Sequence, residues 1–377
     1  MLDFRREFSA IRNEVLQAVT EVCDSQQFIL GPQVERFEQA AAKACNVGYA
    51  AGCASGTDAL WLALAGLEIG PGDAVVTTPF SFFATVSSIL RAGAVPVLAD
   101  IDPATFNLSA ASVEERLSQL PAGASRMAGV MPVHLYGQCA DMDALTAVAE
   151  QHGLKIIEDA AQAFGASWNG VRAGGLGDVA AFSFYPTKNL SAMGDAGMVT
   201  TRSAETDERV RMLRTHGMRR RYFHDEIGWN ARMDTIQAAV LEVKLKRVDA
   251  GNARRRELAA RYDRLLRDAG LAAKSVADGI VLPWTDPRVE HVFHQYVIRA
   301  PRRDALRAYL TSEGIGSEIY YPLPLHQQES LAFLGYKTGD FPESERAANE
   351  VLALPIYPEL REDEIETVVE AVRRFYA

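Results

Sequence analysis

One lysine and one aspartate stand out because each follows an apolar, strand-like run. Lys188 comes shortly after the run 179–184, and Asp159 directly follows the run 154–158. A buried lysine amine loses its proton readily and can then attack a carbonyl carbon. A nearby carboxylate can keep a pyridine nitrogen protonated, so that the ring accepts electrons. The pair therefore predicts a Schiff-base enzyme that uses pyridoxal 5′-phosphate (PLP) and acts on amino groups.

Each residue taken alone has an ordinary structural explanation. Most lysines are solvated surface side chains, and an aspartate after a strand is often a turn or cap residue. The sequence context favours a role in cofactor binding and catalysis, because Gln162 follows Asp159 closely and could donate to a ring hydroxyl. A flexible Gly-Asp-Ala-Gly stretch at 194–197 follows Lys188.

PLP also needs an anchor for its phosphate. The stretch 55–60, Ser-Gly-Thr-Asp-Ala-Leu, begins an expected helix whose free N–H groups and dipole would bind a phosphate. The alternative is a plain N-cap without a ligand. Ser183 could add a hydroxyl to the phosphate site. Phe82 follows Pro79 at another strand end and is the aromatic residue expected to stack on the ring, although most such aromatics belong to the core.

Alternating strand-like and helix-like segments would position these residues. Four apolar runs are expected strands: 73–78, 95–100, 129–134 and 154–158. Helices are expected at 34–47, 84–92 and 141–152. Strands this apolar are covered on both faces, which predicts an α/β fold with a mostly parallel sheet between helices. In such sheets ligands bind at the carboxyl ends of the strands, where Asp159 and the Lys188 loop are expected.

The pattern changes after about residue 235. Residues 235–269 predict one long amphipathic helix, followed by a strand at 292–299 and helices at 303–313 and 362–376. A chain of 377 residues is too long for one small core. The expected division is an N-terminal segment 1–25 that packs with the small domain, a large PLP-binding domain 26–248, and a smaller α+β domain 249–377.

Composition narrows the partners. A net charge of −10 disfavours binding to nucleic acid or to anionic membranes. The four cysteines have no metal-ligand spacing, so we expect reduced thiols, a cytoplasmic protein and no metal site. The N-terminus lacks the pattern of a signal peptide, and no apolar run is long enough to span a membrane.

Two further motifs have alternative explanations. The stretch 175–180, Gly-Leu-Gly-Asp-Val-Ala, is similar to a dinucleotide fingerprint, but a loop precedes it and a strand follows, so we reject that function. The run 219–221, Arg-Arg-Arg, is either a solvated patch or a site for a diphosphate. A nicotinamide oxidoreductase is accordingly disfavoured.

An ordered set of motifs runs almost from end to end of the chain. It comprises 28–32 (Phe-Ile-Leu-Gly-Pro), 55–60, 78–82 (Thr-Pro-Phe-Ser-Phe), 100–102, 133–137, 158–163 (Glu-Asp-Ala-Ala-Gln-Ala), 182–184 with Lys188, 214–217, 228–234 with 237–239, and 321–326 (Tyr-Pro-Leu-Pro-Leu-His). Together these motifs resemble the DegT/DnrJ/StrS family of PLP-dependent nucleotide-sugar aminotransferases.

The resemblance implies the type I PLP-dependent aminotransferase fold and a homodimer whose active sites lie at the interface. It implies that Lys188 bonds covalently to PLP, that Asp159 pairs with the pyridine nitrogen, that Phe82 stacks on the ring and that Gln162 meets the ring hydroxyl. It also implies that the cofactor phosphate is held by Gly56, Thr57 and Ser183, and that Asn230 reaches the phosphate of the neighbouring subunit's cofactor. The residues implied to contact substrate are Tyr321, His326 and Arg232.

The resemblance also implies the reaction. Some relatives carry histidine at the position of Lys188 and are dehydratases, so lysine favours transamination. The Gly-Asp-Ala-Gly stretch and the 230–234 segment resemble members that aminate C3 of 3-keto sugars. We therefore expect amino transfer from L-glutamate to a dTDP- or UDP-linked 3-keto hexose, in amino-sugar and polysaccharide biosynthesis. The alternatives are a 4-keto sugar or cyclitol acceptor, and a non-catalytic PLP-binding regulatory or sensor protein.

Overall fold

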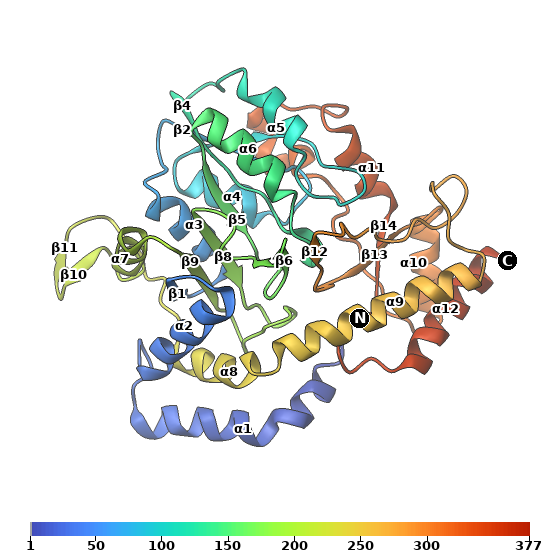
Figure 1. Cartoon of the computed structure of the whole chain (residues 1–377), viewed down its shortest axis with the longest axis horizontal. Helices are drawn as coiled ribbons and strands as arrows, with labels where there is room; N and C mark the ends of the chain where they lie inside the picture. The colour runs from blue at the N-terminus through green and yellow to red at the C-terminus, as the bar shows by residue number, and fades with distance from the viewer. Residues whose placement is uncertain (1) are drawn as a thin grey trace.

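The computed structural model describes residues 2–377, and Met1 of the expected N-terminal segment lies outside the described residues. A seven-stranded sheet forms the centre of the molecule, in the order β1-β9-β8-β5-β4-β2-β3 (Figure 1). Its strands are β1 (Tyr49–Cys53), β2 (Asp73–Thr77), β3 (Val95–Leu98), β4 (Arg126–Val130), β5 (Lys155–Asp159), β8 (Val179–Ser183) and β9 (Gly197–Thr201). Only the pairs of β9 with β8 and with β1 are antiparallel. The expected mostly parallel sheet is confirmed.

Helices surround this sheet and continue into the C-terminal half. They are α1 (Phe4–Ser25), α2 (Pro32–Cys45), α3 (Gly56–Gly66), α4 (Ala84–Arg91), α5 (Ala110–Leu117), α6 (Met142–His152), α7 (Ala204–Leu213), α8 (Thr235–Leu245), α9 (Val248–Asp268), α10 (Arg303–Ser312), α11 (Pro342–Glu350) and α12 (Glu362–Tyr376). The short strands are β6 (Ser167–Trp168), β7 (Val171–Arg172), β10 (Met218–Arg220), β11 (Phe223–His224), β12 (Val289–Glu290), β13 (Tyr296–Arg299) and β14 (Val351–Leu354).

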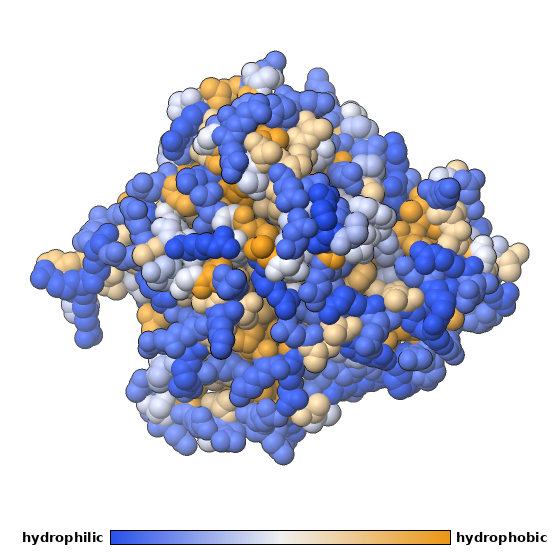
Figure 2. All heavy atoms as spheres, in the orientation of Figure 1, coloured by the Kyte–Doolittle hydropathy of each residue, from blue (hydrophilic) through white to orange (hydrophobic). Residues whose placement is uncertain are grey.

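Side chains of the central strands alternate between two hydrophobic clusters. Val75 belongs to the cluster that contains α3, and Val76 belongs to the cluster that contains α2 and α6. Successive residues of a strand point to opposite faces, so a continuous apolar run fits a sheet covered on both sides. The face drawn in Figure 2 is mostly hydrophilic, with smaller apolar patches near its centre and at its edges. The hydrophobic strands are therefore enclosed between layers of helices.

The predicted single helix over 235–269 is wrong. The chain forms α8 and α9 with a turn at Lys246 and Arg247, and the two helices change direction there (Figure 1). α8 packs on α1 and α2, whereas α9 packs on α12. One straight helix would not make both contacts, and the turn contains no glycine or proline that could have indicated it.

Two strand predictions also need correction. β4 begins three residues before the expected start and ends at Val130, and Val133 forms only an isolated bridge with Asp159. Pro132 offers no N–H, so it cannot extend the ladder of β4 fully. The expected strand 292–299 is limited to β13, because residues 291–295 run as an irregular segment between the two halves of the molecule.

The N-terminal helix contacts both halves of the chain. Ile11 and Val15 pack against Val240 and Val243 of α8. Only the first turn reaches the C-terminal part, where Arg6 forms a bidentate pair with Glu364 at 2.7 and 2.6 Å. We propose the domain division 26–248 and 249–377. The hydrophobic cluster around β13, β14 and α12 supports it, and Phe80, Phe106 and Tyr136 of the large domain pack into that cluster where the two parts meet. Within residues 2–377, no helix is both long and apolar enough to cross a membrane.

Side chains close the outer edge of the sheet at β1. Glu38 of α2 accepts a hydrogen bond from the Gly52 N–H at 2.8 Å. Arg211 and Arg214 donate to the carbonyls of Ala50 (2.7 Å) and Gly52 (2.5 Å). Both guanidinium groups also pair with the Glu38 carboxylate, at 2.6 and 2.5 Å. Polar side chains thereby take the place of a neighbouring strand and protect the edge from pairing.

We expect Glu38→Ala to lower the free energy of unfolding by about 3–5 kcal/mol, because it leaves the buried guanidinium group of Arg214 and a buried N–H without their anion, whereas Arg211 keeps its pair with Asp207 at 2.7 Å. Urea denaturation measures this loss. Glu242→Ala is the matched control, since Glu242 pairs with the half-exposed Arg36 at 3.0 Å and its loss should cost less than about 1 kcal/mol. Equal losses in the two variants would contradict the role of Glu38.

Candidate active site

Lys188 lies in a tight loop that follows β8. The loop is closed by the Lys188 N–H, which donates to the Tyr185 carbonyl, and by the Ala192 N–H, which donates to the Phe184 carbonyl, both at 2.8 Å. Burial lowers the pKa of the Lys188 amine to about 8, although attraction by Asp159 opposes this shift. A sizeable fraction of the amine is therefore neutral near pH 7 to 8 and able to act as a nucleophile or base.

Asp159 ends β5, next to the strand that leads to Lys188. The Thr85 hydroxyl donates to its Oδ2 at 2.8 Å, and the Ala161 N–H donates to Oδ1 at 3.3 Å. Burial raises the pKa of Asp159, while the two hydrogen bonds and the charge of Lys188 lower it. Within residues 2–377 no cationic side chain forms an ion pair with this carboxylate. A cationic ligand atom would therefore stabilise its ionised form.

Gln162, Tyr321 and Phe82 lie together beside Asp159. The Tyr136 N–H donates to Gln162 Oε1 at 2.6 Å, so Gln162 must present its NH₂ group to the site. Gln162 Nε2 donates to the Tyr321 hydroxyl at 3.1 Å. Burial raises the pKa of Tyr321, which keeps its proton available for donation. The rings of Phe82 and Tyr321 are 6.3 Å apart, and Phe82 is 60% exposed, which leaves a ring face free for a flat ligand.

The beginning of α3 meets the end of β8. A Cβ atom added to Gly56 would lie 2.5 Å from the Ser183 Cβ, so only glycine permits this approach. Gly197 faces Ser55 equally closely, with 2.2 Å from its would-be Cβ to the Ser55 carbonyl oxygen. Ser55 caps the helix by accepting from the Asp58 N–H. The first bond of the helix runs from the Ala59 N–H to the Ser55 carbonyl at 2.9 Å. The amides of Gly56 and Thr57 lie in the first turn, where no helical carbonyl can accept from them, so this end retains free donors for an anion.

The start of α3 and the end of β8, with Gly56, Thr57 and Ser183, form a recess that we call the phosphate cradle. Asn230 and Arg232 lie next to this cradle. Arg232 forms an isolated bridge with Cys53, and the Ala54 N–H donates to the Ala231 carbonyl at 3.1 Å. The Arg232 Nε is buried without a hydrogen-bond partner in the described chain. Asn230 is exposed to solvent. The structure thus places a cation near the phosphate cradle and an amide at the surface.

His326 does not lie with the site residues around Asp159 and Lys188. Its ring is buried, contacts Phe341 at 4.8 Å between centroids, and its Nε2 bonds Glu345 at 3.0 Å. A contact with substrate would require the ring to leave this pocket. The position in the motif 321–326 indicated proximity to Tyr321, but the backbone turns the His326 side chain into the interior.

Three supporting residues were missed by sequence reasoning. Thr85 and Tyr136 hold Asp159 and Gln162, and their contacts depend on how separate elements meet in space. Glu158 is fully buried and accepts at 2.8 Å from the N–H groups of Gly174, Leu176 and Gly177. The glycine-rich stretch that is similar to a dinucleotide fingerprint is therefore a structural loop wrapped around Glu158. Glu158 directly precedes Asp159 in the sequence, and this adjacency was the one feature that could have indicated its supporting role.

The residues present fit PLP. An unpaired buried carboxylate suits a pyridinium nitrogen, an exposed aromatic face suits the ring, and a glycine cradle with free amides suits a phosphate. A lysine amine with lowered pKa suits the aldehyde. Among the described residues there is no cluster of three metal-ligating side chains. The fold and this site define a PLP-dependent aminotransferase of fold type I.

The chain belongs to the DegT/DnrJ/EryC1/StrS aminotransferase family, whose model matches residues 9–373. A pleiotropic regulatory protein of Geobacillus stearothermophilus is 47% identical over 376 residues, which cover 100% of this chain and 98% of that protein. A UDP-N-acetyl-3-dehydro-α-D-glucosamine 3-aminotransferase of Acidithiobacillus ferrooxidans is 42% identical, with 99% and 97% covered. The crystal structure of S. venezuelae DesV in complex with a ketimine intermediate has a TM-score of 0.93 and 42% identity, with 99% and 97% covered.

Proposed function

We propose that this enzyme transfers the amino group of L-glutamate to the ketone of a nucleotide-linked sugar, with a 3-keto hexose on dTDP or UDP as the acceptor. The observation that carries the proposal is the buried amine of Lys188 opposite the unpaired carboxylate of Asp159. The 3-aminotransferase named among the relatives supports the position of amination. Glutamate would leave as 2-oxoglutarate, and the sugar would gain the amine in exchange for its carbonyl oxygen.

The bound PLP would supply an electron sink for the carbanion formed when the donor loses its α-proton. Lys188 would hold the cofactor covalently at rest, and its freed amine would move the proton between the donor Cα and the cofactor. Asp159 would stabilise the positive charge on the ring nitrogen, and Thr85 keeps that carboxylate oriented. Gln162 would donate its second amide hydrogen to the ring oxygen. Phe82 would cover the ring and exclude water from one face.

The phosphate and the substrate would be held by separate groups. Gly56, Thr57 and Ser183 would bind the cofactor phosphate. Tyr321 and Arg232 would contact substrate, and this part of the proposal rests on the protonated hydroxyl of Tyr321 and the unpartnered Nε of Arg232. We extend the proposal to His326 only for a state in which its ring moves out of the interior.

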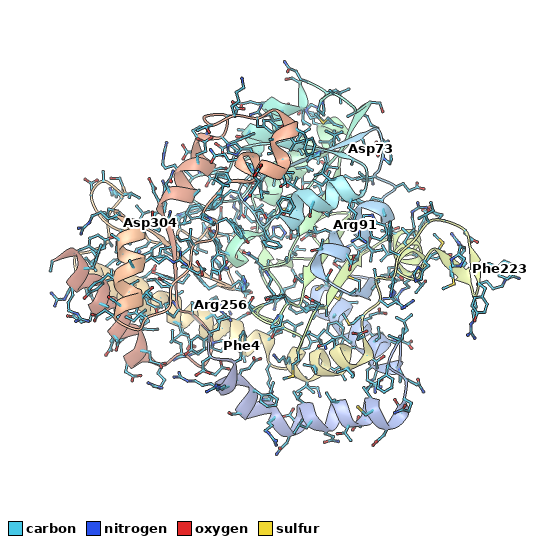
Figure 3. All side chains as sticks on the ribbon, turned by 180° about the vertical axis from the view of Figure 1, so that it is seen from behind. Phe4, Asp73, Arg91, Phe223, Arg256 and Asp304 are labelled. Atoms are coloured by element: carbon cyan, nitrogen blue, oxygen red, sulfur yellow. The ribbon has the colours of Figure 1, made fainter. Side chains whose placement is uncertain are left out.

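We propose a homodimer with shared active sites. Exposed apolar side chains gather at 28–30 and in the segment around β10 and β11, where Tyr222, Phe223 and Ile227 are 75%, 55% and 87% exposed. Phe223 lies at the tip of an arm that projects from the body (Figure 3). Apolar patches of this kind mark interaction sites.

Asn230 follows this arm and would reach the partner's cofactor phosphate, while Arg219, Arg220 and Arg221 would face the substrate diphosphate. Mixing inactive Lys188→Ala and Asn230→Ala proteins should restore activity if the sites are shared, and no recovery would contradict sharing.

The four cysteines are unpaired thiols, three of them buried. Unpaired thiols are typical of a reducing compartment, so we propose a cytoplasmic enzyme.

The acceptor is tested by incubating the PLP-loaded enzyme with glutamate and a panel of UDP- and dTDP-linked 3-keto and 4-keto hexoses. We expect equal amounts of amino sugar and 2-oxoglutarate with a 3-keto sugar. Product from 4-keto sugars alone would move the assignment to C4.

A regulatory function is the second candidate, because the relative of Geobacillus stearothermophilus is named a regulatory protein. A non-catalytic sensor would bind PLP yet release no 2-oxoglutarate from glutamate, which separates it from the enzyme.

A further inference from the structure

Asn189 follows Lys188 directly, and its side chain makes three hydrogen bonds. Nδ2 donates to Asn252 Oδ1 at 2.7 Å and to the Val292 carbonyl at 2.9 Å, and Oδ1 accepts from His294 Nδ1 at 3.1 Å. Asn252 belongs to α9, and Val292 and His294 lie between β12 and β13. One side chain thus ties the Lys188 loop to the C-terminal half of the chain.

The direction of these bonds is fixed. Asn189 uses both amide hydrogens as donors, so its Oδ1 must accept and His294 Nδ1 must carry a proton. Burial, reinforced by the charges of Lys188 and Arg255, holds the pKa of His294 well below its usual value. The ring is therefore neutral, and both polar atoms of the Asn189 side chain are engaged by the protein itself.

The partners of Asn189 have little room to move. Asn252 is 2% exposed and donates to the Phe164 carbonyl at 3.0 Å. The Val292 N–H donates to the Gly137 carbonyl at 3.0 Å. A Cβ atom on Gly137 would lie 2.7 Å from the Val292 side chain, so the two segments are in close contact. Asn189 is consequently attached to a rigid surface.

The other tethers of the loop lead to α8. Lys244 Nζ donates to the Ser191 hydroxyl at 2.9 Å and pairs with Glu7 at 3.0 Å. The Met193 N–H donates to Gln237 Oε1 at 2.8 Å. Without the Asn189 side chain, the loop would be held by its main-chain turn and from the α8 side alone.

We propose that Asn189 is a positioning residue that fastens the Lys188 loop to α9 and to residues 292–294, and so keeps the Lys188 amine at the Asp159 end of the site. The inference rests on the proposed function only in taking Lys188 as the reactive amine. Asn189 acts through Lys188, because both polar atoms of its side chain are engaged by the protein.

The first readout is the reactivity of Lys188 in the protein without cofactor. The pH dependence of its acylation by an amine-selective reagent, followed by peptide mass spectrometry, gives its pKa. The charged and titratable groups around Lys188 are Asp159, His294, Asp3, Glu7, Arg255, Tyr357 and Glu359. We expect a midpoint near 8 in the wild type. In Asn189→Ala the midpoint should rise toward the ordinary lysine value of about 10.4, because the loosened amine meets water.

The second readout is the reaction with glutamate in the PLP-loaded enzyme. Misplacement of the amine should lower kcat by about 100-fold and leave KM close to that of the wild type. Asn189→Asp keeps the shape but cannot donate to Asn252 or Val292. It should show the same loss of kcat, and its added carboxylate should raise the labelling midpoint as well.

Tyr262→Phe is the control for general loosening, because it removes a buried hydrogen bond of 2.9 Å to the Pro355 carbonyl within the C-terminal cluster. It should leave both readouts unchanged. A wild-type labelling midpoint in Asn189→Ala, or the same shift in Tyr262→Phe, would overturn the proposal. Labelling uses neither glutamate nor sugar, so failure of the proposed substrate leaves this test unaffected.

Discussion

Replacement of Lys188 by alanine is expected to lower turnover by at least about 10⁴-fold, because in the proposed mechanism one amine serves as covalent anchor, base and acid. The fold should persist. At neutral pH the buried ammonium group of Lys188 is destabilising, since its pKa of about 8 lies below the value in the unfolded chain. That cost is present at low pH and disappears as pH rises from about 8 toward the unfolded pKa. Relative to Lys188→Ala, the wild-type protein without cofactor should therefore gain stability over this range.

Steady-state release of 2-oxoglutarate and thermal unfolding at several pH values measure both effects. Lys155→Ala is the control, since Lys155 is an exposed lysine at the start of β5 that pairs with Asp178 at 2.8 Å. It should retain wild-type turnover. Near-normal turnover in Lys188→Ala would exclude the assigned chemistry.

Replacement of Asp159 by asparagine is expected to lower kcat by about 10²–10³-fold, the range seen when one preorganised electrostatic contact is removed. Asparagine can still accept from Thr85 but carries no charge, so the ring nitrogen of the cofactor would lose its proton. The variant should also lower the pKa of Lys188 further, because attraction by Asp159 is the one effect that raises it. Stopped-flow absorbance with glutamate and Lys188 labelling without cofactor measure the two changes.

Asp73→Asn is the matched control. Asp73 is also buried at a strand of the same sheet, but it begins β2 and pairs with Arg126 at 2.6 Å (Figure 3). Its replacement should reduce stability and leave kcat near normal. Comparable kcat losses in both variants would show that Asp159 acts through stability rather than through charge.

The sequence was sufficient for features that repeat along the chain or stand at strand ends. Continuous apolar runs predicted the parallel strands, and a carboxylate after one run and a lysine after another predicted that both would meet at one edge. The turn between α8 and α9 was not predictable, because Lys246 and Arg247 are compatible with a helix and only packing on different neighbours separates the two axes.

Contacts that depend on the meeting of distant segments could not be predicted. Thr85 is 74 residues from Asp159, and Asn189 bonds partners 63 to 105 residues away. The inward orientation of His326 follows from the route of the backbone after Pro324, which a motif does not specify. Hydrophobic periodicity predicts helices, strands and the positions where strands end. The hydrogen bonds that support a site can be identified only in the folded structure.

We propose that Lys188 carries PLP and that glutamate releases it. The most direct measurement is to reduce the PLP-loaded protein with borohydride, digest it, and locate the pyridoxyl group by mass spectrometry, with and without prior addition of glutamate. We expect a label on Lys188 alone, which disappears when glutamate is added first. A label on another lysine, or one on Lys188 that glutamate does not remove, would contradict it.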